Sequence, residues 1–130
     1  MVLEVPFPSA APRLWDGVSS VLTAENLQKY ECEGVSIRKL GTLASRPKKG
    51  ALKVAVELML MNRPGHDKLV VVAMQVFSGD VAIGGPAFMR GIDVEEGRTA
   101  LRQGTLFLPE SELRQHPDAK LRLTLTVRDH

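Results

Sequence analysis

Three acidic residues stand close together in the second half of the sequence and could bind a cation. They are Asp93, Glu95 and Glu96, and Gly97 follows them. Ca²⁺ takes roughly six to eight oxygen ligands, and the loops of a β-sandwich can gather carboxylates around it. The spacing of an EF-hand loop is absent, so a solvated turn is the competing interpretation. These three residues are the candidate metal ligands, although no metal or other cofactor is expected.

Residues that could act as nucleophiles or bind transition metals are scattered. His66, His116 and His130 have no second histidine or cysteine at ligand spacing. Cys32 lies between two glutamates, which are unfavourable neighbours for a nucleophilic thiolate. The motifs GxSxG, HExxH and CxxC are absent. We therefore predict no catalytic residue.

Four residues are candidates for contact with a partner. Trp15 is the only tryptophan. It could anchor the N-terminal segment on the core, or it could dominate an interface, where tryptophan is enriched. Arg46, Lys48 and Lys49 belong to the segment SRPKKG, which predicts a turn. Their charges could meet an acidic partner or a phosphate, and a solvated loop is the alternative interpretation.

The element that must position these residues is the apolar stretch from Ala51 to Phe77. It reads ALKVAVELMLM, then NRPGHDK, then LVVVAMQVF. Apolar residues alternate in the first run, and successive side chains of a strand point to opposite faces. The second run is nearly continuous, which is typical of a strand covered on both faces. With Pro64-Gly65 as a turn, the stretch predicts a central hairpin.

Further strand patterns occur on both sides of this stretch. Residues 30–43 and 101–108 predict strands, with Gly104 as a bulge or a point of close approach. The clearest alternation is in Lys120–Arg128. Residues 18–30 favour a helix, with a strand over Val18–Leu22 as the alternative. PESELRQHPD predicts a helical turn with Leu113 facing inward.

These patterns together predict a mainly β fold. We expect an antiparallel β-sandwich of about six to eight strands with one short helix or helical turns, because turn signals recur at short intervals without a βαβ rhythm. Residues 1–17 contain three prolines and predict an extended arm or edge strand. Residues 18–130 are predicted to form a single sandwich domain.

The segment Leu52–Val127 resembles the immunoglobulin-like accessory domains of many bacterial proteins. The resemblance lies in LKVAVELMLMNRPGHDKLVVVAM, EEGRTALRQGTLFLPESEL and the closing KLRLTLTV. In such domains a proline-led helical turn commonly precedes the last strand. The Cys–Trp–Cys arrangement of antibody domains is missing. The resemblance implies an architecture and no particular function.

Composition narrows the function classes. The chain has 130 residues, of which 44% are apolar and 25% are charged, as in an average globular protein. A net charge of +2 without a basic run gives no reason to expect a nucleic acid partner. No apolar run approaches the length of a membrane-spanning helix. The single cysteine and the lack of a signal-peptide pattern favour the cytoplasm, and an exported form stays open.

We therefore expect a non-catalytic protein-binding or assembly module rather than an enzyme. It would associate with a protein partner or with further copies of itself, and a small-molecule ligand is not expected. One alternative is a Ca²⁺-dependent ligand-binding or lipid-binding sandwich that uses the loop at 93–96. Another is a small enzyme whose site is assembled from residues far apart in the sequence.

Overall fold

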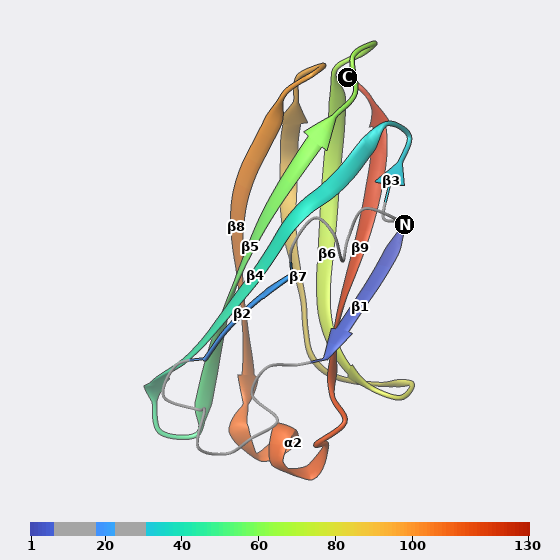
Figure 1. Ribbon diagram of the computed structural model, residues 1–130. Coiled ribbons are helices and arrows are strands. Elements are labelled where there is room, and N and C mark those ends of the chain that lie inside the picture. The colour runs from blue at the N-terminus through green and yellow to red at the C-terminus, as the bar shows by residue number, and fades with distance from the viewer. Residues whose placement is uncertain (7–17, 23–30) are drawn as a thin grey trace.

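Two antiparallel sheets packed face to face form the fold (Figure 1). The computed structural model describes residues 1–6, 18–22 and 31–130. One sheet has four strands in the order β1-β9-β6-β7. The other has five, in the order β2-β4-β5-β8 with β3 also paired to β4. The predicted mainly β sandwich is therefore confirmed.

The bounds of most strands in the second half of the chain follow the predicted runs closely. The four-stranded sheet contains β1 (Val2–Pro6), β6 (Lys68–Ser78), β7 (Val81–Val94) and β9 (Lys120–Asp129). The five-stranded sheet contains β2 (Val18–Leu22), β3 (Glu31–Cys32), β4 (Val35–Lys48), β5 (Ala51–Asn62) and β8 (Thr99–Pro109). The described strands exceed the predicted number because β1, β2 and β3 are short pieces.

Alternate side chains of every central strand meet between the sheets. From β5 the buried residues are Leu52, Val54, Val56, Leu58 and Leu60. From β6 they are Val70, Val72, Met74 and Val76, and from β9 they are Leu121, Leu123, Leu125 and Val127. Burial of one such side chain stabilises the fold by about 1.5–3 kcal/mol. The alternation predicted for β9 is confirmed at all four positions.

The predicted hairpin is wrong in one respect, since β5 and β6 lie in opposite sheets. Each strand is central in its own sheet, with β4 and β8 beside β5, and β7 and β9 beside β6. Each strand has apolar side chains on its inward face. Because the chain crosses from one sheet to the other between β5 and β6, these two inward faces pack against each other. The outer face of β6 is only half-buried, so β6 is not covered on both faces.

Asn62 secures the connection that crosses between the sheets. This buried residue donates from Nδ2 to the carbonyl oxygen of His66 at 2.7 Å and to that of Val94 at 3.0 Å. The second bond joins the end of β5 to the end of β7 in the opposite sheet. A buried amide that is satisfied in this way holds both ends in one arrangement.

Two predicted breaks are absent from the strands that contain them. Strand β4 runs on to Lys48, with a register shift between Ser45 and Lys48, and the turn begins only at Lys49. Among the described strands, β2 pairs with β4 only as far as Ala44. Pro47, which has no N–H to donate, is therefore tolerated at that edge. The sequence Gly84-Gly85-Pro86 predicts the end of a short strand that contains Val81 and Ile83, yet it lies inside β7, an edge strand with register shifts of its own.

The two predictions of helix have different outcomes. Val18–Leu22 is a strand, which is the alternative interpretation, and residues 23–30 lie outside the described part of the chain. The helical turn after Pro109 is confirmed as α2 (Glu110–Gln115), with Leu113 buried. Helix α2 closes one end of the sandwich (Figure 1). Within the described residues, no helix has the length and apolarity to cross a membrane.

Gly104 allows the two sheets to approach closely where β8 meets the four-stranded sheet. A Cβ atom at this position would lie 2.6 Å from Cε of Met74 and 2.8 Å from Cγ of Met89. The register between β5 and β8 is continuous through Gly104, so it is a point of close approach and not a bulge. Strands β7 and β8 thereby close one side of the sandwich.

A charged side chain placed on the buried face of a sheet should greatly lower the stability of the fold. Val72→Asp places a carboxylate at a position with 0% exposure, and the loss should exceed the roughly 5 kcal/mol that holds a small domain folded. Val81→Asp is the matched control, because Val81 is 56% exposed and should change stability by at most about 1 kcal/mol. Urea unfolding of both variants measures the difference. A folded Val72→Asp variant would contradict the assignment of the core.

Gly85 should tolerate alanine less well than Gly91 does. Both glycines lie in β7 and have positive φ angles, 85° and 64°. A Cβ at Gly85 would lie 2.7 Å from the backbone oxygen of Met74, whereas nothing lies within 4 Å at Gly91. We expect Gly91→Ala to cost about 1 kcal/mol and Gly85→Ala at least twice that, measured by urea unfolding. Equal losses of stability in the two variants would show that Gly85 does not lie close to the backbone oxygen of Met74.

Candidate functional site

The predicted acidic loop is used for contacts between turns. Glu95 forms an ion pair with Arg98 at 3.3 Å, and Glu96 accepts a hydrogen bond from the N–H of Gly65 at 2.9 Å. The N–H of Glu96 in turn donates to Asp67 at 3.0 Å. These bonds join the β7–β8 turn to the β5–β6 connection. In the part of the chain that the structure describes, no three His, Cys, Asp or Glu residues are grouped to hold a metal ion.

Of the four predicted partner-binding residues, the structure describes the side chain of Lys49 alone. Lys49 is exposed in the turn between β4 and β5. Arg46 and Lys48 belong to the last part of β4, where the backbone alone is described. Trp15 lies outside the described residues, as does the rest of the predicted arm after Pro6. The first six residues include β1, which pairs with β9.

Sequence reasoning missed the outer face of the four-stranded sheet. The strand registers align Val2, Thr124, Ala73 and Phe88 in one row across β1, β9, β6 and β7. Val2 is 54% and Phe88 is 47% exposed, while the two residues between them are small. The next row contains Glu4, Arg122 and Gln75. Four strands from distant parts of the sequence thus build one surface.

Arg122 contacts residues of both neighbouring strands on this face. Its Nε and Nη2 atoms each lie 3.0 Å from Oε1 of Glu4, on the neighbouring strand. Its guanidinium carbon lies 4.0 Å from the centre of the Phe77 ring on the other side. A cation over an aromatic face is attracted by the negative charge density of the ring. Glu4, Arg122 and Phe77 therefore hold one another in place across three strands.

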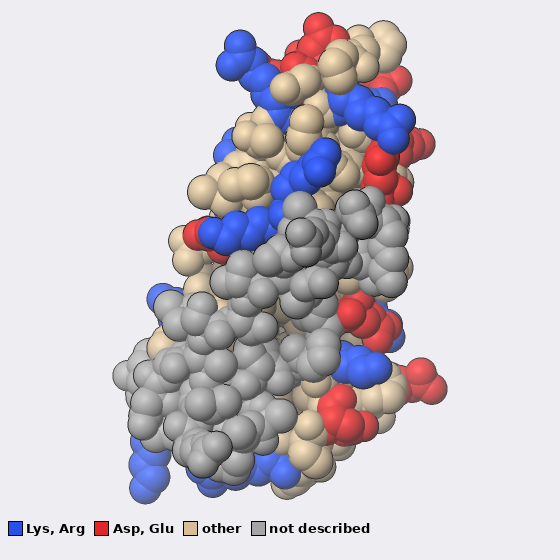
Figure 2. All heavy atoms as spheres, in the orientation of Figure 1, with Lys and Arg blue, Asp and Glu red and all other residues tan. Residues whose placement is uncertain are grey.

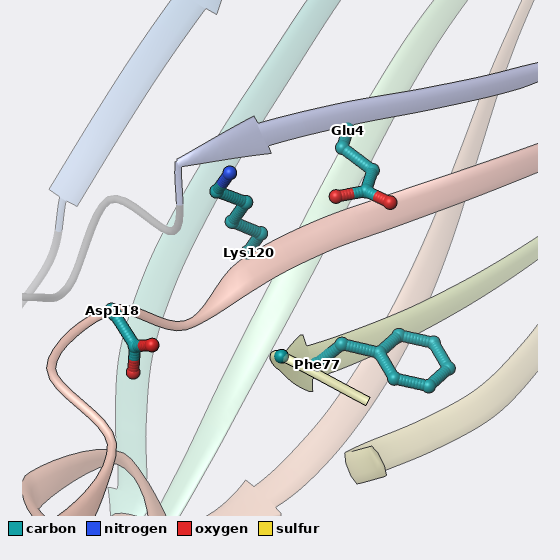
Figure 3. Close-up of a pocket in the computed structure, with 5 residues that line it drawn as sticks. Glu4, Phe77, Asp118 and Lys120 are labelled. Carbon is teal, nitrogen blue, oxygen red and sulfur yellow. The ribbon is translucent and has the colours of Figure 1, made fainter. Parts of the chain in front are cut away.

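A shallow depression adjoins this trio at the end of the sheet. It has a volume of about 290 Å³ and is lined by Glu4, Phe77, Gly79, Asp118 and Lys120. Figure 3 shows that Glu4, Phe77 and Lys120 extend from three strands, while Asp118 comes from the loop before β9. The depression thus combines two carboxylates, an ammonium group and an aromatic ring.

Asp118 is held ionised at this site. The Ser78 hydroxyl donates to its Oδ1 at 2.8 Å, and this bond is the main cause that lowers the pKa of Asp118. A backbone hydrogen bond lowers the pKa of Asp118 further, desolvation opposes this effect, and the charges of His116 and Lys120 add smaller lowering effects. Asp118 is exposed, so its carboxylate can accept a hydrogen bond from a ligand.

The second candidate site is the part of β9 that follows its pairing with β1 and has no other described strand on that side. Strand β1 pairs with Lys120–Thr124, and the N–H and C=O groups of Leu125 bond to Met1 at 2.8 Å and 3.0 Å. In an antiparallel strand, alternate residues direct their backbone groups to the same neighbour. The backbone groups of Val127 and Asp129 therefore point to the same side as those of Leu125. No described strand lies beside them.

Charges of both signs are spread over the described part of the face seen in Figure 2. Neither sign dominates there. The ion pair of Lys39 with Glu57 joins β4 to β5, and that of Arg63 with Glu31 joins the connection after β5 to β3. A surface of this kind offers no broad field of one sign to attract a highly charged partner.

Comparisons with known proteins support the fold alone. No protein-family model matches the sequence, and no curated protein matches it. A crystal structure of a protein from Archaeoglobus fulgidus is similar, with a TM-score of 0.51, 10% identity, and coverage of 73% of this chain and 94% of that chain. At 10% identity, the likeness extends to the sandwich fold and no further.

Two further solved structures show a lower similarity. A β-glucuronidase from glycoside hydrolase family 2 has a TM-score of 0.46 and 10% identity over 76% of this chain and 10% of that chain. TmCBM61 in complex with β-1,4-galactotriose has a TM-score of 0.26 and 11% identity over 99% of this chain and 88% of that chain. Both scores are below 0.5, so neither structure bears on the function of this chain.

Removal of the Ser78 hydroxyl should raise the pKa of Asp118. A carboxyl whose pKa is lowered by folding stabilises the protein above the unfolded-state pKa, and this stabilisation is lost as the pH falls through the folded-state pKa. The stability difference between the wild type and Ser78→Ala should therefore be present at neutral pH and disappear in acid. Carboxyl carbon NMR titration measures the pKa directly.

Asp129 provides an internal control in the same titration. Its pKa is lowered mainly by a hydrogen bond from Lys68, which Ser78→Ala does not touch. We expect the pKa of Asp129 to stay unchanged while that of Asp118 rises. An unchanged Asp118 would show that the Ser78 bond is not formed in solution.

Proposed function

We propose that this chain is a non-catalytic protein-binding or assembly module that binds an extended segment along the open part of β9. The observation that carries this proposal is the direction of the backbone groups of Val127 and Asp129. They point to the side of β9 on which β1 pairs with Lys120–Thr124, and no described strand lies beside them. Unpaired backbone groups on a sheet edge are a template for a further strand.

The pairing of β1 illustrates how such a segment would bind. Its residues add to β9 in antiparallel register, and Leu3 is buried to 2% exposure beneath the sheet edge. A partner strand continuing the line of β1 would meet the same pattern of donors and acceptors. Main-chain hydrogen bonds would supply the affinity. Contacts of alternate partner side chains with the core and with the outer face would determine which sequences bind.

The half-open edge also supports an assembly role. A segment from a second copy of the chain could occupy it and produce a homo-oligomer, as strand addition does in other sandwiches. The resemblance of Leu52–Val127 to bacterial immunoglobulin-like accessory domains concerns architecture. On that basis we propose that the sandwich is immunoglobulin-like, and the assembly role rests on the backbone groups of β9.

The proposal is tested by blocking one backbone donor of the open edge. Asp129→Pro removes the N–H that points outward from β9, and an edge strand tolerates proline. It also removes the ion pair with Lys68. Asp129→Ala is the matched control, since it loses the ion pair and keeps the N–H. Tagged wild-type and variant chains are compared for the proteins that they retain from an extract of the natural source.

We expect one or more proteins to be retained by the wild type and by Asp129→Ala, and to bind Asp129→Pro about tenfold more weakly. Sedimentation equilibrium over a range of concentrations applies the same comparison to self-association. Identical retained proteins and identical masses for all three chains would refute binding at this edge.

A further inference from the structure

We propose that the depression lined by Glu4, Phe77, Gly79, Asp118 and Lys120 binds a neutral, hydroxyl-rich ring, such as one hexose of a glycan. This site lies at the other end of β9 from the open edge. Its occupation is therefore independent of the proposed partner strand. The inference rests on the balance of charge in the depression, on the way its groups are held, and on its size.

The balance of charge favours a neutral ligand. Glu4 and Asp118 contribute two carboxylates, while Lys120 and the adjoining Arg122 contribute two cations. A simple anion would meet both carboxylates, and a simple cation would meet both basic groups. A hydroxyl group can donate to a carboxylate and accept from an ammonium group. A ring with several hydroxyls can thus satisfy groups of both signs at once.

Neighbouring side chains hold the two carboxylates of the depression in place, and a ligand can still reach both carboxylates. Arg122 contacts Oε1 of Glu4, and Ser78 donates to Oδ1 of Asp118. Within the described residues Oε2 of Glu4 forms no hydrogen bond or ion pair, and Asp118, which also receives a backbone hydrogen bond, is exposed to solvent. The ammonium group of Lys120 likewise forms no ion pair within the described chain, and Lys120 is exposed. Side chains that are already held in place lose little conformational entropy when a ligand binds.

Phe77 gives the depression an apolar side. Its ring is half-buried at the end of β6 and is held by the guanidinium of Arg122 at 4.0 Å. A hexose carries C–H groups on its ring faces and hydroxyls at its rim, so it can contact an aromatic side chain and polar groups together. A mixture of apolar surface and few polar groups is typical of ligand sites.

The size of the depression sets the extent of the ligand. Its volume of about 290 Å³ is at the lower limit of small-molecule sites. One ring fits this volume, whereas an oligosaccharide would extend over the outer face of the sheet. Because the depression is shallow, we expect a dissociation constant in the millimolar range for a single sugar.

The test is an NMR titration of the full chain with methyl glycosides of glucose, galactose and mannose. Inorganic phosphate and ethylammonium serve as the anionic and cationic probes. We expect at least one glycoside to cause saturable shifts in the amides of Phe77, Gly79, Asp118 and Lys120. Neither charged probe should cause saturable shifts there.

Three variants separate this site from a general surface effect. Asp118→Asn and Lys120→Met each remove one charged group of the depression and should weaken the glycoside at least tenfold. Arg128→Met removes an exposed cation from the same strand outside the depression and should leave binding unchanged. The amide spectrum of each variant shows whether it is folded.

Several results would overturn the proposal. They are the absence of saturable shifts with every glycoside, shifts confined to amides elsewhere, saturable binding of phosphate or ethylammonium at this site without glycoside binding, and equal weakening by Arg128→Met. Binding at the open edge of β9 would stand in each case, because Asp129 takes no part in the depression.

Discussion

The structure depends on one constraint, namely that the inward apolar side chains of β5 and β6 must be buried against each other. Both strands carry an unbroken set with period two, and neither set can be covered within its own sheet. The chain satisfies both by crossing between the sheets after Asn62. Gly104 then lets β8 approach Met74 and Met89, which brings the sheets to close contact. The outer faces and the edges are what remains for function.

The two sides of the sandwich are closed differently. Strands β7 and β8 lie against each other on one side, where Gly84 faces Leu108. On the other side, the short β1 covers part of β9 and leaves the part near the C-terminus without a described neighbour. The same short strand places Glu4 beside Arg122, and so it also builds the depression at the opposite end. The position of β1 on β9 therefore shapes both candidate sites.

The sequence predicts the elements better than their assembly. Strand β9 could be predicted residue by residue, because its alternation is local and one of its faces is polar. The placement of β5 and β6 in opposite sheets could not be predicted. Alternation indicates which side chains face inward, but it does not indicate which strand pairs with which. The depression has no local signal either, because Glu4 and Arg122 meet only through the register of β1 on β9. Asp93, Glu95 and Glu96 were visible as a cluster, yet the folded loop directs Glu95 and Glu96 to Arg98 and Gly65.

The central claim is that the backbone groups of Val127 and Asp129 on the β1 side of β9 are available to a partner strand, and amide hydrogen exchange in a dilute sample tests it most directly. Leu123 and Val127 both have buried side chains in β9, so burial does not distinguish them. The alternation set by the Leu125–Met1 pair directs the N–H of Leu123 to β1 and that of Val127 to the open side. We predict slow exchange at Leu123 and exchange faster by several orders of magnitude at Val127. Equal protection of the two amides would contradict the open edge.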